Sequence, residues 1–163
     1  MIRSMLFLPG NTPNMLINGD ALGADAVILD LEDAVSPQEK DAARILVRNA
    51  LSRMGFGCRT VVRINALDSG LCQADLEEIV PQGPTALMLP KTANAGQIQQ
   101  LDAEITRLEQ QNGMKPGRVG VIALLETALG VENAFSIATA SPRVLGLFLG
   151  GEDLTADLQC KRT

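Results

Sequence analysis

Six short runs rich in valine, isoleucine and leucine recur along the chain, and longer amphipathic segments separate them. This alternation is typical of a parallel sheet whose strands are joined by helices. The runs predict strands over residues 4–8, 26–32, 60–65, 86–90, 119–126 and 144–150, and the segments between them predict helices over 14–22, 38–54, 73–79, 95–111 and 129–139. No repeat or linker interrupts the pattern, so we expect a single domain over residues 1–163.

Two of the predicted helices begin with recognisable signals. Thr12 stands before Pro13, and Ser36 stands before Pro37, so each helix would have a capping hydroxyl ahead of a proline in its first turn. Glu39 follows Ser36 by three residues. That spacing predicts a capping box at the start of the second helix.

Polar residues follow every predicted strand, from Gly10-Asn11 after the first to Glu152-Asp153 after the sixth. A TIM (β/α)₈ barrel and a doubly wound sheet both place their active sites at this carboxyl edge. No GxGxxG follows the first strand, so the glycines give the doubly wound sheet no support. From the residues alone both folds stay open, and we consider the TIM barrel first.

A TIM barrel would be incomplete in this chain. A full barrel takes about 250 residues, so about six of its eight β/α units would be present here. Three alternatives stay open: the sequence is truncated, other chains supply the closing elements, or the sheet remains open.

Composition narrows the chemistry. The chain has no histidine, which excludes imidazole bases, zincin sites and serine–histidine or cysteine–histidine pairs. Its net charge of −5 argues against a nucleic-acid or anionic-membrane surface. The apolar residues between Arg3 and Pro9 are too few for a signal or membrane segment, and the three cysteines suggest neither a disulfide framework nor a metal site. We therefore expect a cytoplasmic protein.

Three carboxylates, Asp30, Glu32 and Asp33, end the second apolar run. Buried carboxylates are unfavourable unless they are paired or bind a cation. One alternative is that one of them caps the next helix or pairs there with Lys40 or Arg44; the other is that all three belong to a site.

Cationic side chains follow the next two strands. Arg63 and Asn65 share a face of the third strand in the two-residue period, so both would point to the same side of the sheet. Arg63 could neutralise the acidic cluster or hold a substrate carboxylate through its planar fork. Lys91, after the fourth strand, has the same two interpretations.

Glu126 and Asp153 each end an apolar run that carries no other charge. Two carboxylates at neighbouring strand ends fit a Mg²⁺ site whose other ligands are waters and substrate oxygens. Gly150 and Gly151 would allow close approach there, and the alternative for Asp153 is a helix cap. Met5, Met88 and the four phenylalanines are predicted core residues, and Glu104, Arg107 and Glu109 are predicted to form a solvated helix face.

Six segments, in order, carry a resemblance: RSMLFLPG, LDLEDAV, VVRIN, LMLPK, ALLET and LGGEDLTADL. Together they closely resemble the citrate lyase β-subunit-like lyases of the HpcH/HpaI aldolase superfamily, which include malyl- and citramalyl-coenzyme A lyases. The resemblance implies a TIM barrel with catalytic residues Arg63, Glu32 and Asp33, Mg²⁺ ligands Glu126 and Asp153, and a substrate-binding set of Arg63, Arg3, Pro9, Gly10 and Lys91.

The implied reaction is Mg²⁺-dependent cleavage of a β-hydroxy acyl thioester, such as citryl-acyl carrier protein, to oxaloacetate and the acetyl thioester. One alternative is a free-standing malyl- or citramalyl-coenzyme A lyase. Another is an inactive fragment that serves as a binding or assembly module. Family members add a C-terminal segment that packs on a neighbouring subunit, so a homo-oligomer, with other lyase-complex subunits as further candidate partners, is expected.

Overall fold

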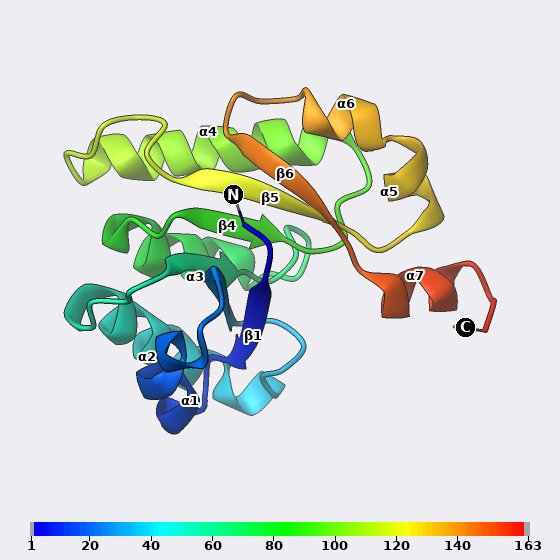
Figure 1. Ribbon diagram of the computed structural model, residues 1–163. Coiled ribbons are helices and arrows are strands. Elements are labelled where there is room, and N and C mark those ends of the chain that lie inside the picture. The colour runs from blue at the N-terminus through cyan, green and yellow to red at the C-terminus, as the bar shows by residue number, and fades with distance from the viewer. Residues whose placement is uncertain (1, 162–163) are drawn as a thin grey trace.

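The computed structural model describes residues 2–161 and contains one parallel sheet in which the six strands follow one another in chain order (Figure 1). The strands are β1 (Met5–Pro9), β2 (Ala26–Asp30), β3 (Arg59–Arg63), β4 (Ala86–Leu89), β5 (Gly120–Leu125) and β6 (Val144–Leu149). The predicted parallel α/β fold is confirmed, and the sequential order is that of a barrel rather than of a doubly wound sheet. Within the described residues β1 and β6 remain the two edges, so barrel closure stays a prediction.

The longer helices cover the outer face of the sheet (Figure 1). The helices are α1 (Pro13–Asn18), α2 (Lys40–Arg53), α3 (Cys72–Ile79), α4 (Ala95–Gln111), α5 (Ala128–Glu132), α6 (Ala134–Ala138) and α7 (Gly151–Asp157), with 3-10 turns η1 (Asp20–Leu22), η2 (Pro37–Glu39) and η3 (Val80–Gln82). In the part of the chain that the structure describes, none of them is long and apolar enough to span a membrane.

Alternate residues of the strands enter two separate apolar clusters. The larger cluster joins the outer face, for example Leu29 and Leu87, to helix residues such as Val47 and Leu101. The smaller cluster lies on the inner face and contains Ile28, Val61, Ala86, Met88, Ile122 and Leu124. The sheet therefore curls around its own small core, as a barrel wall does.

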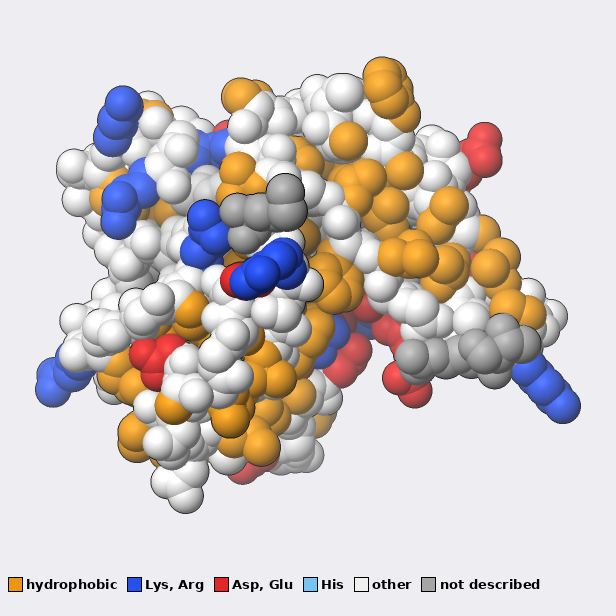
Figure 2. All heavy atoms as spheres, in the orientation of Figure 1, with side chains coloured by type: hydrophobic (Ala, Val, Ile, Leu, Met, Phe, Trp, Pro, Cys, Tyr) orange, Lys and Arg blue, Asp and Glu red, His pale blue; other side chains and the backbone are white. Residues whose placement is uncertain are grey.

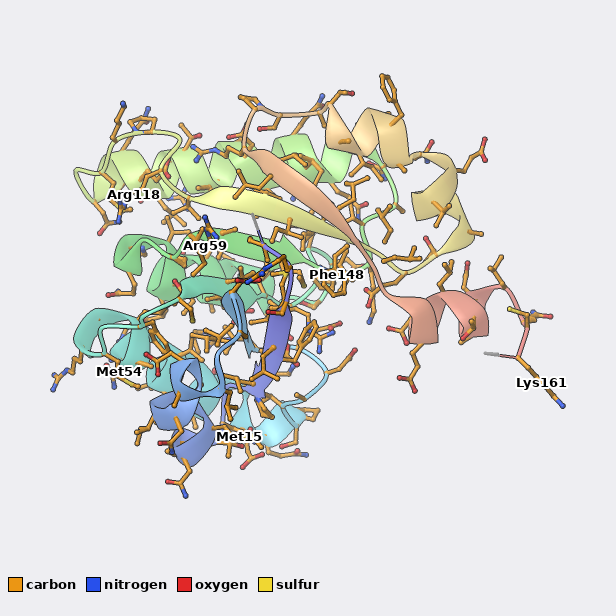
Figure 3. All side chains as sticks on the ribbon, viewed as in Figure 1. Met15, Met54, Arg59, Arg118, Phe148 and Lys161 are labelled. Atoms are coloured by element: carbon orange, nitrogen blue, oxygen red, sulfur yellow. The ribbon has the colours of Figure 1, made fainter. Side chains whose placement is uncertain are left out.

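The two edge strands approach each other at one end of this inner face. The rings of Phe7 on β1 and Phe148 on β6 meet edge to face, with centroids 6.1 Å apart. In Figure 3, Phe148 lies toward the carboxyl ends of the strands, away from Arg59 and Arg118 at their amino ends. The curled sheet thus brings β1 and β6 close without a hydrogen-bonded pairing between them.

The structure corrects the predicted helix starts. The Ser36 hydroxyl does not cap a backbone N–H; it donates to Glu39 Oε2 at 3.0 Å, and residues 37–39 form the turn η2 before α2. Thr12 likewise makes no capping hydrogen bond at α1. A capping box does occur on α4, where Asn94 and Gln97 bond reciprocally.

The predicted solvated face of α4 is wrong at Glu109, whose side chain is completely buried. Glu109 accepts hydrogen bonds from Arg143 and from the N–H groups of Gly117 and Val119. Arg143 also donates to Asp102, so this guanidinium ties α4 to the start of β6. Glu109, Arg143 and Asp102 thus form a structural network of buried or half-buried charges.

Strand β6 is the least covered strand of the sheet. Leu145, Leu147 and Leu149 are all exposed, and Leu129 and Phe135 on the neighbouring helices are exposed too. Apolar side chains gather in the same region on the face shown in Figure 2, over β6, α5 and α7. Proteins usually cover or charge an apolar sheet edge of this kind.

Candidate active site

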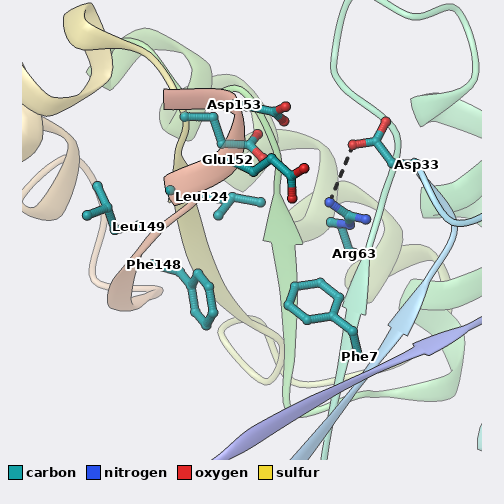
Figure 4. Close-up of a pocket in the computed structure, with 11 residues that line it drawn as sticks. Phe7, Asp33, Arg63, Leu124, Phe148, Leu149, Glu152 and Asp153 are labelled. Atoms are coloured by element: carbon teal, nitrogen blue, oxygen red, sulfur yellow. Dashed lines mark ion pairs between the residues drawn. The ribbon is translucent and has the colours of Figure 1, made fainter. Parts of the chain in front are cut away.

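A pocket of about 640 Å³ opens at the carboxyl ends of the strands (Figure 4). Its lining is Phe7, Asp33, Arg63, Leu124, Glu126, Phe148, Leu149, Gly150, Gly151, Glu152 and Asp153. Asp30, Arg63 and Glu126 each follow by two positions an inner-face residue of the small core, and Arg63 and Glu126 line the pocket while Asp30 is buried beside Arg63. The site is therefore built on the continuation of the inner face.

Arg63 ends β3 directly opposite Asp30, the last residue of β2. Its Nε donates to Asp30 Oδ1 at 2.7 Å, and its Nη2 donates to Asp30 Oδ2. The guanidinium carbon lies 5.1 Å from the centre of the Phe7 ring, a cation–π contact. One edge of the planar fork, formed by Nε and Nη2, is thus occupied by Asp30, and Nη1 faces the other carboxylates and the pocket.

Asp30 also organises the turn that follows β2. Its Oδ1 accepts the N–H of Glu32 at 2.8 Å, and its Oδ2 accepts the N–H of Ala34 at 3.1 Å. Each carboxylate oxygen therefore accepts one main-chain donor and one guanidinium donor. The alternative that the acidic residues pair with Arg44 is wrong, since Arg44 pairs with Asp41 and Asp75.

Glu32 lies between two cations. Its Oε2 is 3.1 Å from Arg63 Nη1, and its Oε1 is 3.3 Å from Lys91 Nζ. Oε2 is buried and accepts no hydrogen bond from the described residues, so the contact with Arg63 is a charge contact only. Burial raises the pKa of Glu32, although the charges of Arg63 and Lys91 oppose it. Asp33 is more exposed and lies 3.7 Å from Arg63 Nη1, the ion pair drawn in Figure 4.

Glu126 faces the acidic cluster from β5, and its only described hydrogen-bond donor is the N–H of Lys91, at 2.8 Å. Lys91 has the left-handed φ of 52°, rare outside glycine, and this turn aims its N–H at Glu126. Burial raises the pKa of Glu126 to about 7; the Lys91 N–H opposes the shift, and the charges of Glu32 and Asp153 add to it.

Asp153 approaches Glu126 from the first turn of α7, and Gly150 makes this possible. A Cβ at Gly150 would come within 2.6 Å of Glu126 Cγ, so only glycine lets the backbone pass there. Figure 4 shows Glu152 and Asp153 on the side of the pocket opposite Arg63 and Asp33. Arg63 and Lys91 contact the β2 carboxylates, whereas no described Lys or Arg pairs with Glu126, Glu152 or Asp153.

Glu126 and Asp153, which pair with no described Lys or Arg, fit a hard divalent cation. In the described chain no three His, Cys, Asp or Glu residues are arranged to hold a metal by themselves. Mg²⁺ commonly takes one or two protein carboxylates and completes its octahedron with waters and substrate oxygens. Glu126 and Asp153 therefore suit a site of that kind better than a cage made by the protein alone.

The structure sets several predicted residues apart from the pocket. Arg3 precedes β1 at the amino edge of the sheet, where its 80% exposed side chain pairs with Asp25; it does not line this pocket, and its predicted substrate contact stays a prediction. Pro9 ends β1 and Gly10 follows it, and neither lines the pocket; a Cβ at Gly10 would lie 2.6 Å from the carbonyl oxygen of Asp30, so this glycine serves strand packing. Asn65 does not share the side of Arg63, because its side chain bonds to Asp75 on α3.

Two other lining residues were expected in the core and not at a site. Phe7 and Phe148 wall the pocket and are not simply core residues. Glu152 lines it beside Asp153, and the helix-cap alternative for Asp153 fails because Asp153 lies within α7 and makes no cap. The two-residue period would have found both phenylalanines, since each shares the inner face of its strand.

Comparison with known proteins agrees with this geometry. A family model described as HpcH/HpaI aldolase/citrate lyase matches residues 3–163. Citrate lyase subunit beta of Leuconostoc mesenteroides subsp. cremoris is 42% identical over 161 residues, which are 98% of this chain and 53% of that protein. The solved citrate lyase beta subunit from M. tuberculosis complexed with oxaloacetate and magnesium has a TM-score of 0.76 at 36% identity and covers 97% of this chain and 62% of that one.

More distant relatives carry other names. A (3S)-malyl-CoA thioesterase of Cereibacter sphaeroides (strain ATCC 17029) is 36% identical over 157 residues, which are 96% of this chain and 51% of that protein.

Fold and site together define a parallel α/β protein with an acidic pocket, containing one guanidinium, at the carboxyl edge of its sheet. The chain belongs to the HpcH/HpaI aldolase/citrate lyase family, which confirms the resemblance seen in its six ordered segments. It spans about half the length of the curated relatives it matches.

Proposed function

We propose that this chain forms the keto-acid and Mg²⁺ side of a carbon–carbon lyase that cleaves a β-hydroxy acyl thioester. The observation that carries the proposal is the placement of Glu126 and Asp153 on one side of a pocket and Arg63 on the other. The family membership supports it, as does the solved relative complexed with oxaloacetate and magnesium. We further propose that residues 1–163 form one domain and that the protein acts in the cytoplasm.

In the proposed reaction the substrate hydroxyl loses its proton and the bond between the hydroxyl carbon and the thioester α-carbon breaks. The ketone leaves as the keto acid, and the electron pair of the broken bond forms a thioester enolate that is then protonated. Mg²⁺ held by Glu126 and Asp153 would polarise the oxygen that becomes the ketone.

The chain's own residues supply the rest of the environment. Arg63 Nη1, the donor that Asp30 leaves unused, faces the pocket and can stabilise developing negative charge or a substrate carboxylate. Glu32 and Lys91 fix the position of one another beside it. Phe7 and Phe148 form an apolar wall that limits water on the side of the small core.

The proposal has alternatives that differ in the acyl group and in the carrier that bears it. The 42% identical relatives named citrate lyase subunit beta favour a citryl thioester of an acyl carrier protein. The relative named (3S)-malyl-CoA thioesterase favours a malyl-coenzyme A substrate and, in place of C–C cleavage, thioester hydrolysis. Product analysis separates them, since only the lyase releases a keto acid. The proposed partners are the acyl thioester, the keto acid and further subunits, including copies of this chain.

The metal assignment is tested by thermal unfolding with and without Mg²⁺. A ligand that binds the native state raises its apparent stability by mass action, so we expect Mg²⁺ to raise the unfolding temperature of the native sequence. Glu126→Ala and Asp153→Ala should each abolish this rise, and Glu104→Ala, at an exposed carboxylate of α4, should keep it. A rise of the same size in both site variants would refute the assignment.

A further inference from the structure

Lys40, the first residue of α2, makes three hydrogen bonds through its ammonium group. Nζ donates to the carbonyl oxygens of Leu31 and Glu32 at 2.7 and 2.6 Å and to Asn65 Oδ1 at 2.8 Å. An ammonium has three donors, and here each meets an acceptor in a turn that follows β2 or β3. Lys40 thus holds the turn of the acidic cluster through its main chain rather than through a carboxylate.

Asn65, which accepts one of these hydrogen bonds, is itself held in the protein interior. Asn65 donates its N–H and its Nδ2 to Asp75 Oδ2 at 2.8 and 2.7 Å. Asp75, on α3, also accepts from Arg44 Nε at 2.8 Å, and its side chain is only 1% exposed. A buried chain of polar groups therefore runs from α2 and α3 through Asn65 to Lys40 and ends at the turn after β2.

That turn is held from its opposite side by the residues of the pocket. Asp30 accepts the N–H of Glu32, and the Glu32 carboxylate lies between Arg63 and Lys91. The carbonyl oxygens of the turn point to the helix layer and are bound only by Lys40 among these side chains. Without Lys40, the carbonyl oxygens of Leu31 and Glu32 lose a charged donor, and among the described donors only the Val35 N–H still donates to Glu32 O, so the peptide planes that aim the Glu32 side chain are held less firmly on that side.

We propose that Lys40 is a positioning residue of the candidate site, which acts through the carbonyl groups of Leu31 and Glu32 to hold the Glu32 carboxylate between Arg63 and Lys91. The inference rests on the proposed function for its binding readout. Its structural readout, protection of the turn, does not depend on that function.

The test compares Lys40→Met with Lys40→Arg, which keeps a charged donor, and with Lys115→Met, at an exposed lysine far from the turn in sequence. Amide hydrogen exchange of residues 31–35 is measured beside that of β5, and oxaloacetate is titrated calorimetrically in the presence of Mg²⁺. We expect Lys40→Met to speed exchange in 31–35 alone and to weaken oxaloacetate binding about tenfold or more, as for a lost charged hydrogen bond. Lys40→Arg should restore both in part, and Lys115→Met should change neither.

Exchange at the native rate, or faster exchange with oxaloacetate affinity within about threefold of native, would overturn the positioning role. If the native protein binds no oxaloacetate, the proposed function fails, and the exchange arm still decides whether Lys40 holds the turn. Should Lys40→Met not fold, Lys40→Gln, which is too short to reach both carbonyl oxygens, takes its place with the same readouts.

Discussion

Asp30→Asn is a nearly isosteric change that isolates the electrostatics of the site. Oδ1 accepts from the Glu32 N–H and from Arg63 Nε, and Oδ2 accepts from the Ala34 N–H and from Arg63 Nη2. Because each oxygen meets two donors, an asparagine must place its NH₂ group against two N–H donors in either orientation of the amide. Flipping the side chain therefore gives no relief.

The expected loss of unfolding free energy is large. Asp30 is 1% exposed and the Arg63 side chain 11% exposed, so the substitution takes from a mostly buried guanidinium its bidentate carboxylate and leaves only the contacts of Nη1 with Glu32 and Asp33. Removing one partner of a buried pair costs about 3–5 kcal/mol, and the remaining amide oxygen recovers part, which gives about 3 kcal/mol here. A typical domain has about 5–15 kcal/mol in total, so the variant should fold with a much lower urea midpoint.

Equilibrium urea denaturation measures the loss, provided the slope against denaturant matches that of the native protein. Asp33→Asn is the matched control, since that carboxylate is 58% exposed and lies 3.7 Å from Arg63 Nη1. It should cost less than about 1 kcal/mol. A loss below about 1 kcal/mol for Asp30→Asn, or equal losses for both variants, would contradict the four-bond arrangement.

Three further outcomes are expected. Arg63→Lys keeps the charge but not the planar fork, so calorimetry should show keto-acid binding weaker by about 2 kcal/mol or more; equal affinities would mean that Arg63 only neutralises the acidic turn. Arg143→Met leaves Glu109 buried without its cation and should lower the unfolding free energy by about 3–5 kcal/mol in urea titrations, whereas a cost like that of a surface pair would refute the network. Burial disfavours ionised Glu109, but Arg143 and two backbone N–H groups outweigh it and lower its pKa below the ordinary value of 4.5, so its stabilisation is present above about pH 4.5 and is lost as pH falls through the folded pKa. Urea midpoints followed down to about pH 3 should fall more steeply for the native protein than for Glu109→Gln, and parallel curves would contradict this.

The sequence predicted the elements well because their signals are local. Strand and helix positions follow from the period of the apolar residues, and all six strands lie within the predicted ranges or within one residue of them. The predicted helix over 129–139 is broken into α5 and α6 at Asn133, whose Nδ2 donates to the carbonyl oxygen of Ala93. That bond joins residues 40 apart in the chain, and no local pattern announces it.

Charged residues were harder to place, because their surroundings depend on contacts between distant segments. Glu109 looks like a surface residue of α4 by composition, yet Arg143 comes from the start of β6 and covers it. Lys40 looks like a counter-ion for the acidic cluster, yet it binds the carbonyl oxygens of that turn. Both errors come from assigning partners by sequence distance and charge alone.

The role of Arg63 shows how much depends on strand register. The sequence allowed two interpretations, a neutraliser of the acidic cluster or a clamp for a substrate carboxylate, and gave no way to choose. Because β2 and β3 pair with Asp30 opposite Arg63, both side chains leave the same face at the same height, and the fork closes on Asp30. A shift of one residue would turn Arg63 toward the helices. Asp30 takes the Nε–H and one N–H of Nη2, so the N–H groups left for a substrate carboxylate are those of Nη1 and the second one of Nη2. Neutralising the acidic turn therefore does not prevent Arg63 from also acting as the proposed clamp.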